Sequence, residues 1–170
     1  YGNGMDALAL TDHGNMNGLA WQVLHAKKMQ AEGKDFKPIF GCEAYFVPSI
    51  AEWRDDYETI MQDKKAARAA KKDETSGATV EDEEASKKAT RNILNRRRHL
   101  VLLVQNQTGL NNLFKLISES YQPENFYRYP RLDFDLLEKY NEGIIASSAC
   151  LGGVYAGCYW ENRDKGEEAV

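Results

Sequence analysis

The sequence lacks the features of a membrane or secreted protein. No apolar run approaches the roughly eighteen residues of a membrane span, and the chain does not open with a basic region followed by an apolar core. Cys42, Cys150 and Cys158 are odd in number and do not have the spacing of a disulfide framework. We therefore expect a cytoplasmic protein with reduced thiols and no membrane association.

A net positive charge and compact metal motifs are also lacking. The formal net charge is −4, which gives no overall basic surface for nucleic acid, although a local one remains open. No pair of cysteines has the CxxC spacing of a compact zinc site. With 170 residues, of which 42% are hydrophobic and 28% charged, the composition is that of one soluble globular domain rather than a disordered chain.

The first apolar segment ends in two residues with functional side chains. Residues 7–11 carry no charge, which predicts a strand buried on both faces, and Asp12 and His13 follow. Residues 15–32 have the apolar spacing of a helix, and residues 37–47 predict a second strand. This strand–helix–strand unit places Asp12 and His13 at the carboxyl end of a parallel strand, where α/β folds hold their functional residues.

The alternation of strands and helices continues toward the end of the chain. Residues 99–104 and 143–150 predict buried strands, and residues 109–121 and 133–140 predict helices with one apolar side. His99 begins its strand, which is the wrong end for a site in an all-parallel barrel. Either that strand begins earlier, or this part of the α/β fold is irregular.

A charged segment interrupts this pattern. Residues 54–98 contain 12 Lys or Arg and 10 Asp or Glu, with no apolar stripe wide enough to build a core. They predict a helical insertion on the surface of the domain. Its basic clusters could contact phosphates, but the nearly balanced charge favours a solvated face.

Four side chains that can bind metal lie beside the predicted strands. They are His13, Glu43, His99 and Cys150. Glu43 lies within an apolar segment, where a carboxylate must be paired, bound to a cation or protonated, unless it lies at a solvated edge. Imidazole, carboxylate and thiolate together suit zinc, and the nitrogen and oxygen ligands also suit manganese or iron.

An aromatic and basic loop covers residues 125–131. It includes Tyr127, Arg128 and Arg131. Such residues can stack on bases and hold phosphates, so these three are candidate contacts to nucleic acid or to a partner protein. Ordinary loop packing is the alternative.

Six short motifs, read in order, resemble one family. They cover residues 10–16, 37–43, 99–103, 108–113, 130–133 and 148–153. The chain resembles the PHP (polymerase and histidinol phosphatase) domain found at the amino end of replicative DNA polymerase III alpha subunits of bacteria and phages. The resemblance covers nearly all of residues 1–170 outside the charged insertion.

The resemblance implies a distorted (β/α)7 barrel that holds up to three divalent metal ions, with zinc, manganese and iron as candidates. Paired histidines of the first family motif would precede Tyr1, and an Asp-x-His pair would follow Val170. The chain is therefore expected to be an internal fragment, a partial PHP domain lacking the first and last strands.

By the same resemblance, His13, Glu43 and His99 match metal ligands, and Cys150 occupies a position that is histidine in many phosphatase relatives. Asp12 would orient His13 or its neighbours from outside the ligand set. Metal-bound hydroxide would attack a phosphorus atom.

The implied parent protein is a DNA-directed DNA polymerase, a nucleotidyltransferase of DNA replication. Its PHP domain would support 3′–5′ exonuclease proofreading or other phosphoester hydrolysis, and its partners would be DNA, a proofreading subunit and a sliding clamp. One alternative is a stand-alone metal-dependent phosphoesterase. The other is a scaffold domain of the polymerase that no longer hydrolyses anything.

Overall fold

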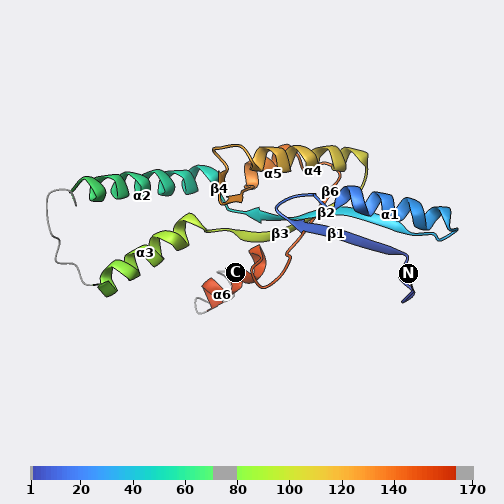
Figure 1. Ribbon diagram of the computed structural model, residues 1–170, viewed down its shortest axis with the longest axis horizontal. Coiled ribbons are helices and arrows are strands. Elements are labelled where there is room, and N and C mark those ends of the chain that lie inside the picture. Colours follow the sequence, from blue (N-terminus) through green and yellow to red (C-terminus); the bar gives the residue numbers. More distant parts are fainter. Residues whose placement is uncertain (1, 71–79, 164–170) are drawn as a thin grey trace.

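A four-stranded mixed sheet forms the centre of the computed structural model, which describes residues 2–70 and 80–163 (Figure 1). The strands lie in the order β1-β2-β3-β6, with bounds Ala7–His13, Lys37–Phe46, Arg98–Val104 and Ile144–Ser147. β1 and β2 are parallel, whereas β3 runs antiparallel to both β2 and β6. The predicted α/β class is confirmed, and its strands do not all run the same way.

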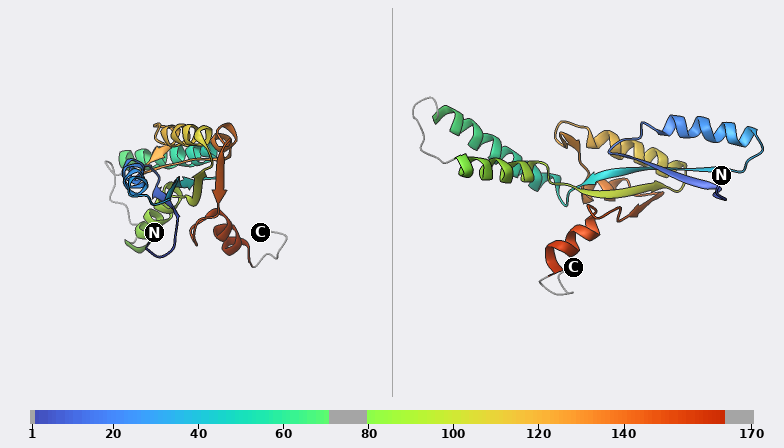
Figure 2. Two further views of the ribbon diagram at one scale, coloured as in Figure 1. Left: turned by 90° about the vertical axis from the view of Figure 1, so that its right-hand side faces the viewer. Right: turned by 60° about the horizontal axis from the view of Figure 1, so that its bottom comes forward.

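Two long helices cover one face of the sheet. α1 (Leu19–Ala31) and α4 (Gln107–Ser120) lie on this side, and α6 (Val154–Asn162) lies on the other (Figures 1 and 2). α4 begins where the Asn106 side chain accepts a hydrogen bond from the Gly109 amide at 2.9 Å. The short helix α5 (Phe134–Lys139) packs beside α4 through Leu136 and Leu137.

The hydrophobic core lies between the sheet and α4. Its fully buried members are Cys42, Ala44, Leu102, Leu113, Leu116 and Leu132. Side chains alternate along a strand, so the even-numbered residues of β2 that enter this core leave Gly41, Glu43 and Tyr45 on the opposite face. One face of the sheet is thereby assigned to packing, and the other is left for polar groups.

The prediction that β1 is buried on both faces is wrong. Leu8 is 55% exposed, and no residue of β1 is fully buried. β1 is the edge strand of the described sheet, with a strand partner on one side only. An uncharged run therefore marked a strand correctly but overestimated its burial.

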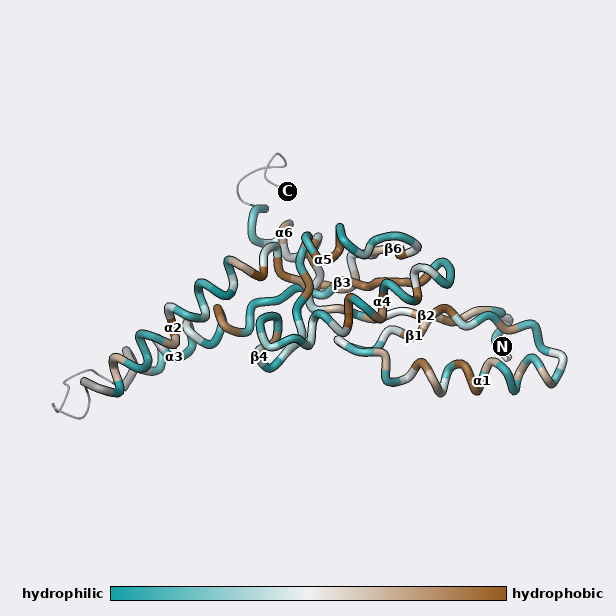
Figure 3. Tube along the Cα trace, turned by 90° about the horizontal axis from the view of Figure 1, so that it is seen from above, coloured by the Kyte–Doolittle hydropathy of each residue, from teal (hydrophilic) through white to brown (hydrophobic). Residues whose placement is uncertain are grey.

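The charged insertion contains two helices that project away from the sheet. α2 (Ile50–Ala70) and α3 (Val80–Leu94) lie side by side (Figures 1 and 2) and are mostly hydrophilic (Figure 3). Their base is fixed where the buried Trp53 indole donates a hydrogen bond to the Leu94 carbonyl at 3.3 Å. Residues 71–79, within the predicted insertion, lie outside the described residues.

Membrane insertion receives no support from the helices. None of those in the described ranges is both long and apolar enough to cross a bilayer.

Candidate metal centre

The register of β1 and β2 places the first two candidate ligands together. His13 is paired with Glu43 at the carboxyl ends of these parallel strands, so both side chains project from the same face. His13 Nδ1 lies 3.5 Å from Glu43 Oε2. The strand–helix–strand unit read from the sequence therefore brings these two residues into contact.

The reversed direction of β3 brings His99 to the same edge. Because β3 is antiparallel to β2, its first residues lie beside the last residues of β2, and His99 pairs with Tyr45. The His99 Nδ1 atom lies 2.6 Å from Glu43 Oε1. Since β3 begins at Arg98, the unusual position of His99 reflects an irregular sheet and not an earlier strand start.

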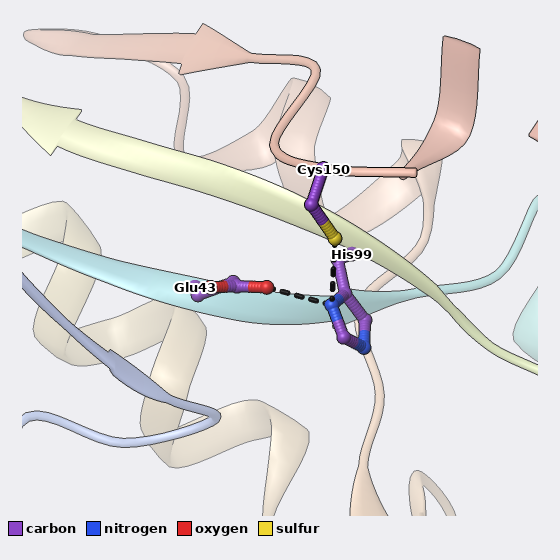
Figure 4. A group of neighbouring side chains, drawn as sticks. All are labelled: Glu43, His99 and Cys150. Atoms are coloured by element: carbon purple, nitrogen blue, oxygen red, sulfur yellow. Dashed lines mark hydrogen bonds and ion pairs between the residues drawn. The ribbon is translucent and has the colours of Figure 1, made fainter. Parts of the chain in front are cut away.

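Cys150 reaches the cluster from the loop after β6. β6 is antiparallel to β3, so the chain beyond its end returns toward the start of β3, where Gly153 bridges to His99. Cys150 Sγ lies 3.5 Å from His99 Nδ1, and the Gly152 amide donates to the sulfur at 3.4 Å. Figure 4 shows Glu43, His99 and Cys150 converging.

The donor atoms of this cluster fit a metal ion. One ligand atom from each of Glu43, His99 and Cys150 lies within 4.8 Å of the others. Oxygen, nitrogen and sulfur donors at this separation form a ligand set typical of zinc. His13 stands beside this trio through its contact with Glu43, and its side chain is 63% exposed, compared with 17% for Glu43.

Asp12 makes its contact with a helix. Its Oδ2 atom accepts a hydrogen bond at 2.6 Å from the amide of Gly18, the N-cap residue of α1. The adjacent Cys42 thiol donates to the Asp12 carbonyl at 3.4 Å, and burial raises the pKa of Cys42 to about 12. Asp12 therefore connects β1 to α1, and its influence on His13 stays a prediction.

Tyr45 and Arg97 form an aromatic and cationic wall beside the cluster. The Tyr45 ring lies 5.6 Å from the His99 ring and 6.5 Å from the His13 ring. The Arg97 guanidinium lies 5.0 Å from the Tyr45 ring and 3.7 Å from that of Tyr129. Burial raises the pKa of Tyr45. Tyr45 lies on the same face of β2 as Glu43, and the fold brings Arg97 beside it.

Gly14 allows this wall to approach β1. Its φ is +67°, and a Cβ atom there would lie 2.8 Å from Cε2 of Tyr45. Any side chain at position 14 would therefore clash with Tyr45 and would also strain the backbone.

The suggestion that Arg131 contacts nucleic acid or a partner is wrong. Arg131 is fully buried, and its guanidinium donates to the carbonyls of Leu94 and Tyr129 at 2.7 and 3.0 Å. Burial lowers the pKa of Arg131 to about 10. Tyr127 is half-buried and Arg128 is exposed, so both remain candidates for binding.

Comparisons with known proteins identify the family of this chain. The family model described as PHP domain matches residues 2–170. The chain is 36% identical to the DNA polymerase III subunit alpha of Aquifex aeolicus over 89% of its length, and 36% identical to that of Borreliella burgdorferi over 94%. It is 34% identical to the same subunit of Deinococcus radiodurans over 86%.

These relatives are much longer than the chain. The matched region is 10% of the Aquifex and Borreliella proteins and 8% of the Deinococcus protein, so the chain spans about a tenth of their length. The family match covers nearly every residue, including all four candidate ligands. This chain belongs to the PHP domain family.

Proposed function

We propose that this chain is part of the PHP domain of a replicative DNA polymerase of the III alpha type, and that the parent protein is a DNA-directed DNA polymerase acting in DNA replication. The match to polymerase subunits over most of the chain supports this proposal. The stand-alone phosphoesterase is less favoured, because the polymerase relatives match both sides of the projecting hairpin. The expected partners are DNA, a proofreading subunit and a sliding clamp, in the cytoplasm.

The proposed function of the site is to bind divalent metal ions and hydrolyse a phosphoester, with 3′–5′ exonuclease activity as the leading reaction. The observation that carries it is the convergence of Glu43 from β2, His99 from β3 and Cys150 from the loop after β6. With His13, these residues would hold zinc, manganese or iron. The bound metal would supply Lewis acidity and activate water.

The described side chains suit this role in different ways. Glu43 has one carboxylate oxygen toward each histidine. Its two oxygens could therefore serve two neighbouring metal ions, one beside each histidine. The His13 side chain is 63% exposed, compared with 26% for His99 and 17% for Glu43. This exposure leaves the His13 side of the cluster accessible to a substrate. Arg97 brings a positive charge to the aromatic wall, where it can attract a phosphate.

The distorted (β/α)7 barrel also remains a proposal. β1 is an edge strand with exposed apolar residues, so a further strand could pair with it. In the proposed barrel, segments outside this chain provide that strand and the remaining ligands, for up to three metal ions.

The decisive experiment uses the full-length protein with its polymerase site inactivated. Metal content and release of 3′ nucleotides from DNA would be measured for wild type and for the double variant His99→Gln, Cys150→Ser. The matched control is His25→Gln, Cys158→Ser, which changes an exposed helix histidine and an exposed cysteine. We expect the ligand variant to lose metal and at least about 100-fold in rate, while the control retains both.

Other outcomes would contradict parts of the proposal. Bound metal with nucleotide release that is indifferent to the ligand variant would make this domain a metal-stabilised scaffold. Metal-free wild-type protein would remove the proposed centre altogether. Rapid hydrolysis of small phosphate monoesters without action on DNA would favour the stand-alone phosphoesterase.

A further inference from the structure

A groove lies at the projecting hairpin, away from the residues of the metal centre. It is formed by α2, α3 and the turn between β4 (Phe126–Tyr127) and β5 (Tyr129–Pro130), and has a volume of about 460 Å³. This volume is in the range of about 300–1,000 Å³ typical of ligand sites. Its charged and aromatic lining consists of Asp63, Lys64, Lys87, Arg91, Tyr127 and Arg128.

The groove concentrates positive charge. Among the lining side chains that the structure describes, four are basic and one is acidic. Lys64, Lys87, Arg91 and Arg128 are all exposed. A concave surface with an excess of one charge raises the local concentration of counter-charged ligands, so this groove favours an anion.

Tyr127 adds an aromatic surface to the basic one. Its ring lies 5.4 Å from the ring of Tyr57 on α2 and 5.6 Å from the Arg128 guanidinium. These contacts hold the ring in place while leaving the side chain half-exposed. A positioned aromatic ring among phosphate-binding side chains is the combination with which proteins bind unpaired bases and their backbone.

The backbone at Arg128 is unusual for a charged residue. Its φ is +60°, in the left-handed region that glycine occupies with least strain, at the single residue between β4 and β5. An arginine at this position extends a cationic side chain from a tight turn into the groove. Strained positions of this kind are concentrated at functional sites.

We propose that this groove binds single-stranded nucleic acid. Lys64, Lys87, Arg91 and Arg128 contact successive phosphates, and Tyr127 stacks on a base. An acidic peptide would satisfy the charges but would leave the aromatic surface without a role, so nucleic acid is favoured. The site goes beyond the proposed metal chemistry and uses none of its ligands.

Photo-crosslinking tests this proposal in the full-length protein. An oligodeoxythymidine containing 5-iododeoxyuridine would be irradiated with the protein in EDTA, and crosslinked peptides would be mapped by mass spectrometry. Peptide mapping separates this groove from other DNA-binding surfaces, and EDTA makes the result independent of the metal centre. We expect a crosslink at Tyr127.

Charge-matched variants identify the responsible surface. Lys64→Glu with Arg91→Glu should lower the Tyr127 crosslink at least about 10-fold, because two phosphate contacts become repulsive. The control is Lys65→Glu with Lys88→Glu, which makes the same charge change at exposed neighbours outside the groove. The control should stay within about twofold of wild type.

The salt dependence of binding by the wild-type protein tests the proposal without variants, which could misfold. With four phosphates contacted, raising salt from 50 to 200 mM should lower the apparent affinity that the Tyr127 crosslink reports about 50-fold. Absence of a Tyr127 crosslink, or equal loss in both variants, would overturn the proposal. More effective competition by polyglutamate than by unlabelled oligodeoxythymidine would overturn it in favour of an acidic protein partner.

Discussion

Arg131 connects two segments of backbone and one aromatic side chain from inside the protein. Its guanidinium donates to carbonyls on α3 and on the β4–β5 loop and lies 4.0 Å from the ring of Trp53. Even with its pKa lowered to about 10, Arg131 carries its charge at neutral pH. The two arginines of the loop therefore have different roles. Arg131 packs inside the protein, whereas Arg128 is exposed and remains a candidate for binding.

Replacing Arg131 should loosen this region. Arg131→Met removes the guanidinium donors of the Tyr127 and Tyr129 carbonyls and leaves the Leu94 carbonyl with the Trp53 indole as its side-chain donor, so we expect the free energy of local opening to fall by about 3 kcal/mol. Hydrogen exchange of the peptide over residues 125–133 measures it. Arg128→Met, at an exposed position in the same loop, should change it by less than about 0.5 kcal/mol. Equal effects would contradict the packing role of Arg131.

The three thiols should differ in reactivity. Cys42 is buried with a pKa of about 12, whereas Cys150 and Cys158 are exposed and free. At pH 8 in the presence of chelator, we expect an alkylating reagent to modify Cys150 and Cys158 and to spare Cys42. Adding zinc should protect Cys150 alone. Protection of Cys158 to the same degree would show that the metal effect does not arise at the cluster.

At the scale of elements, the direction of β3 decides where the site forms. Apolar runs and their spacing predicted the location of the four sheet strands, but not that β3 runs opposite to β2. A short hairpin turn between two strands would have indicated an antiparallel pair. The charged helices between Phe46 and Arg98 remove that signal, so the sequence left the role of His99 open until its pairing with Tyr45 was known.

Asp133 joins two helices that are distant in sequence. Its carboxylate accepts hydrogen bonds from the amide of Leu136 in α5 at 3.0 Å and from that of Ile50 in α2 at 3.1 Å. The side chain therefore caps α5 and fixes the beginning of α2. Asp133 is 6% exposed, so water cannot easily replace it.

Removing this carboxylate should destabilise both helix starts. We expect Asp133→Ala to lower the free energy of local opening by about 2 kcal/mol, because a cap and a buried hydrogen bond are lost together. Asp135→Ala removes an exposed acid from the first turn of α5 and should cost about 0.5 kcal/mol. Hydrogen exchange of the peptides that contain Ile50 and Leu136 would test both, and an effect restricted to α5 would contradict the connection to α2.

At the scale of the molecule, the proposed metal ligands lie on three strands and on the loop after a fourth, and these strands are otherwise joined by backbone pairing. A metal bound by the folded state alone should therefore stabilise the domain. At a free concentration 100 times Kd, the expected gain is about 2.7 kcal/mol. Calorimetry of the purified protein with and without chelator should show it for wild type and for His25→Gln. In His99→Gln the gain should be largely absent, and an unchanged shift would place the metal elsewhere.

The sequence predicted the α/β class, which is confirmed, as well as a helical insertion and four candidate ligands. It overestimated the burial of β1 because an apolar run does not reveal whether a strand lies at an edge, and Leu8 is largely exposed there. It also missed the contribution of Arg97, since a cation packed on Tyr45 and Tyr129 depends on residues far apart in the chain. Such features depend on three-dimensional packing and leave no periodic pattern.

The hairpin of α2 and α3 leaves and re-enters the sheet at neighbouring strand ends, with Phe46 opposite Arg98. Because both ends of the hairpin join the sheet at adjacent points, the hairpin can be lengthened, shortened or replaced without shifting the register of β2 and β3. The length and sequence of this hairpin can therefore change while the geometry of the candidate ligands beside its base is kept. For protein engineering, the same connection is a suitable site for inserting a sensor domain or an affinity tag.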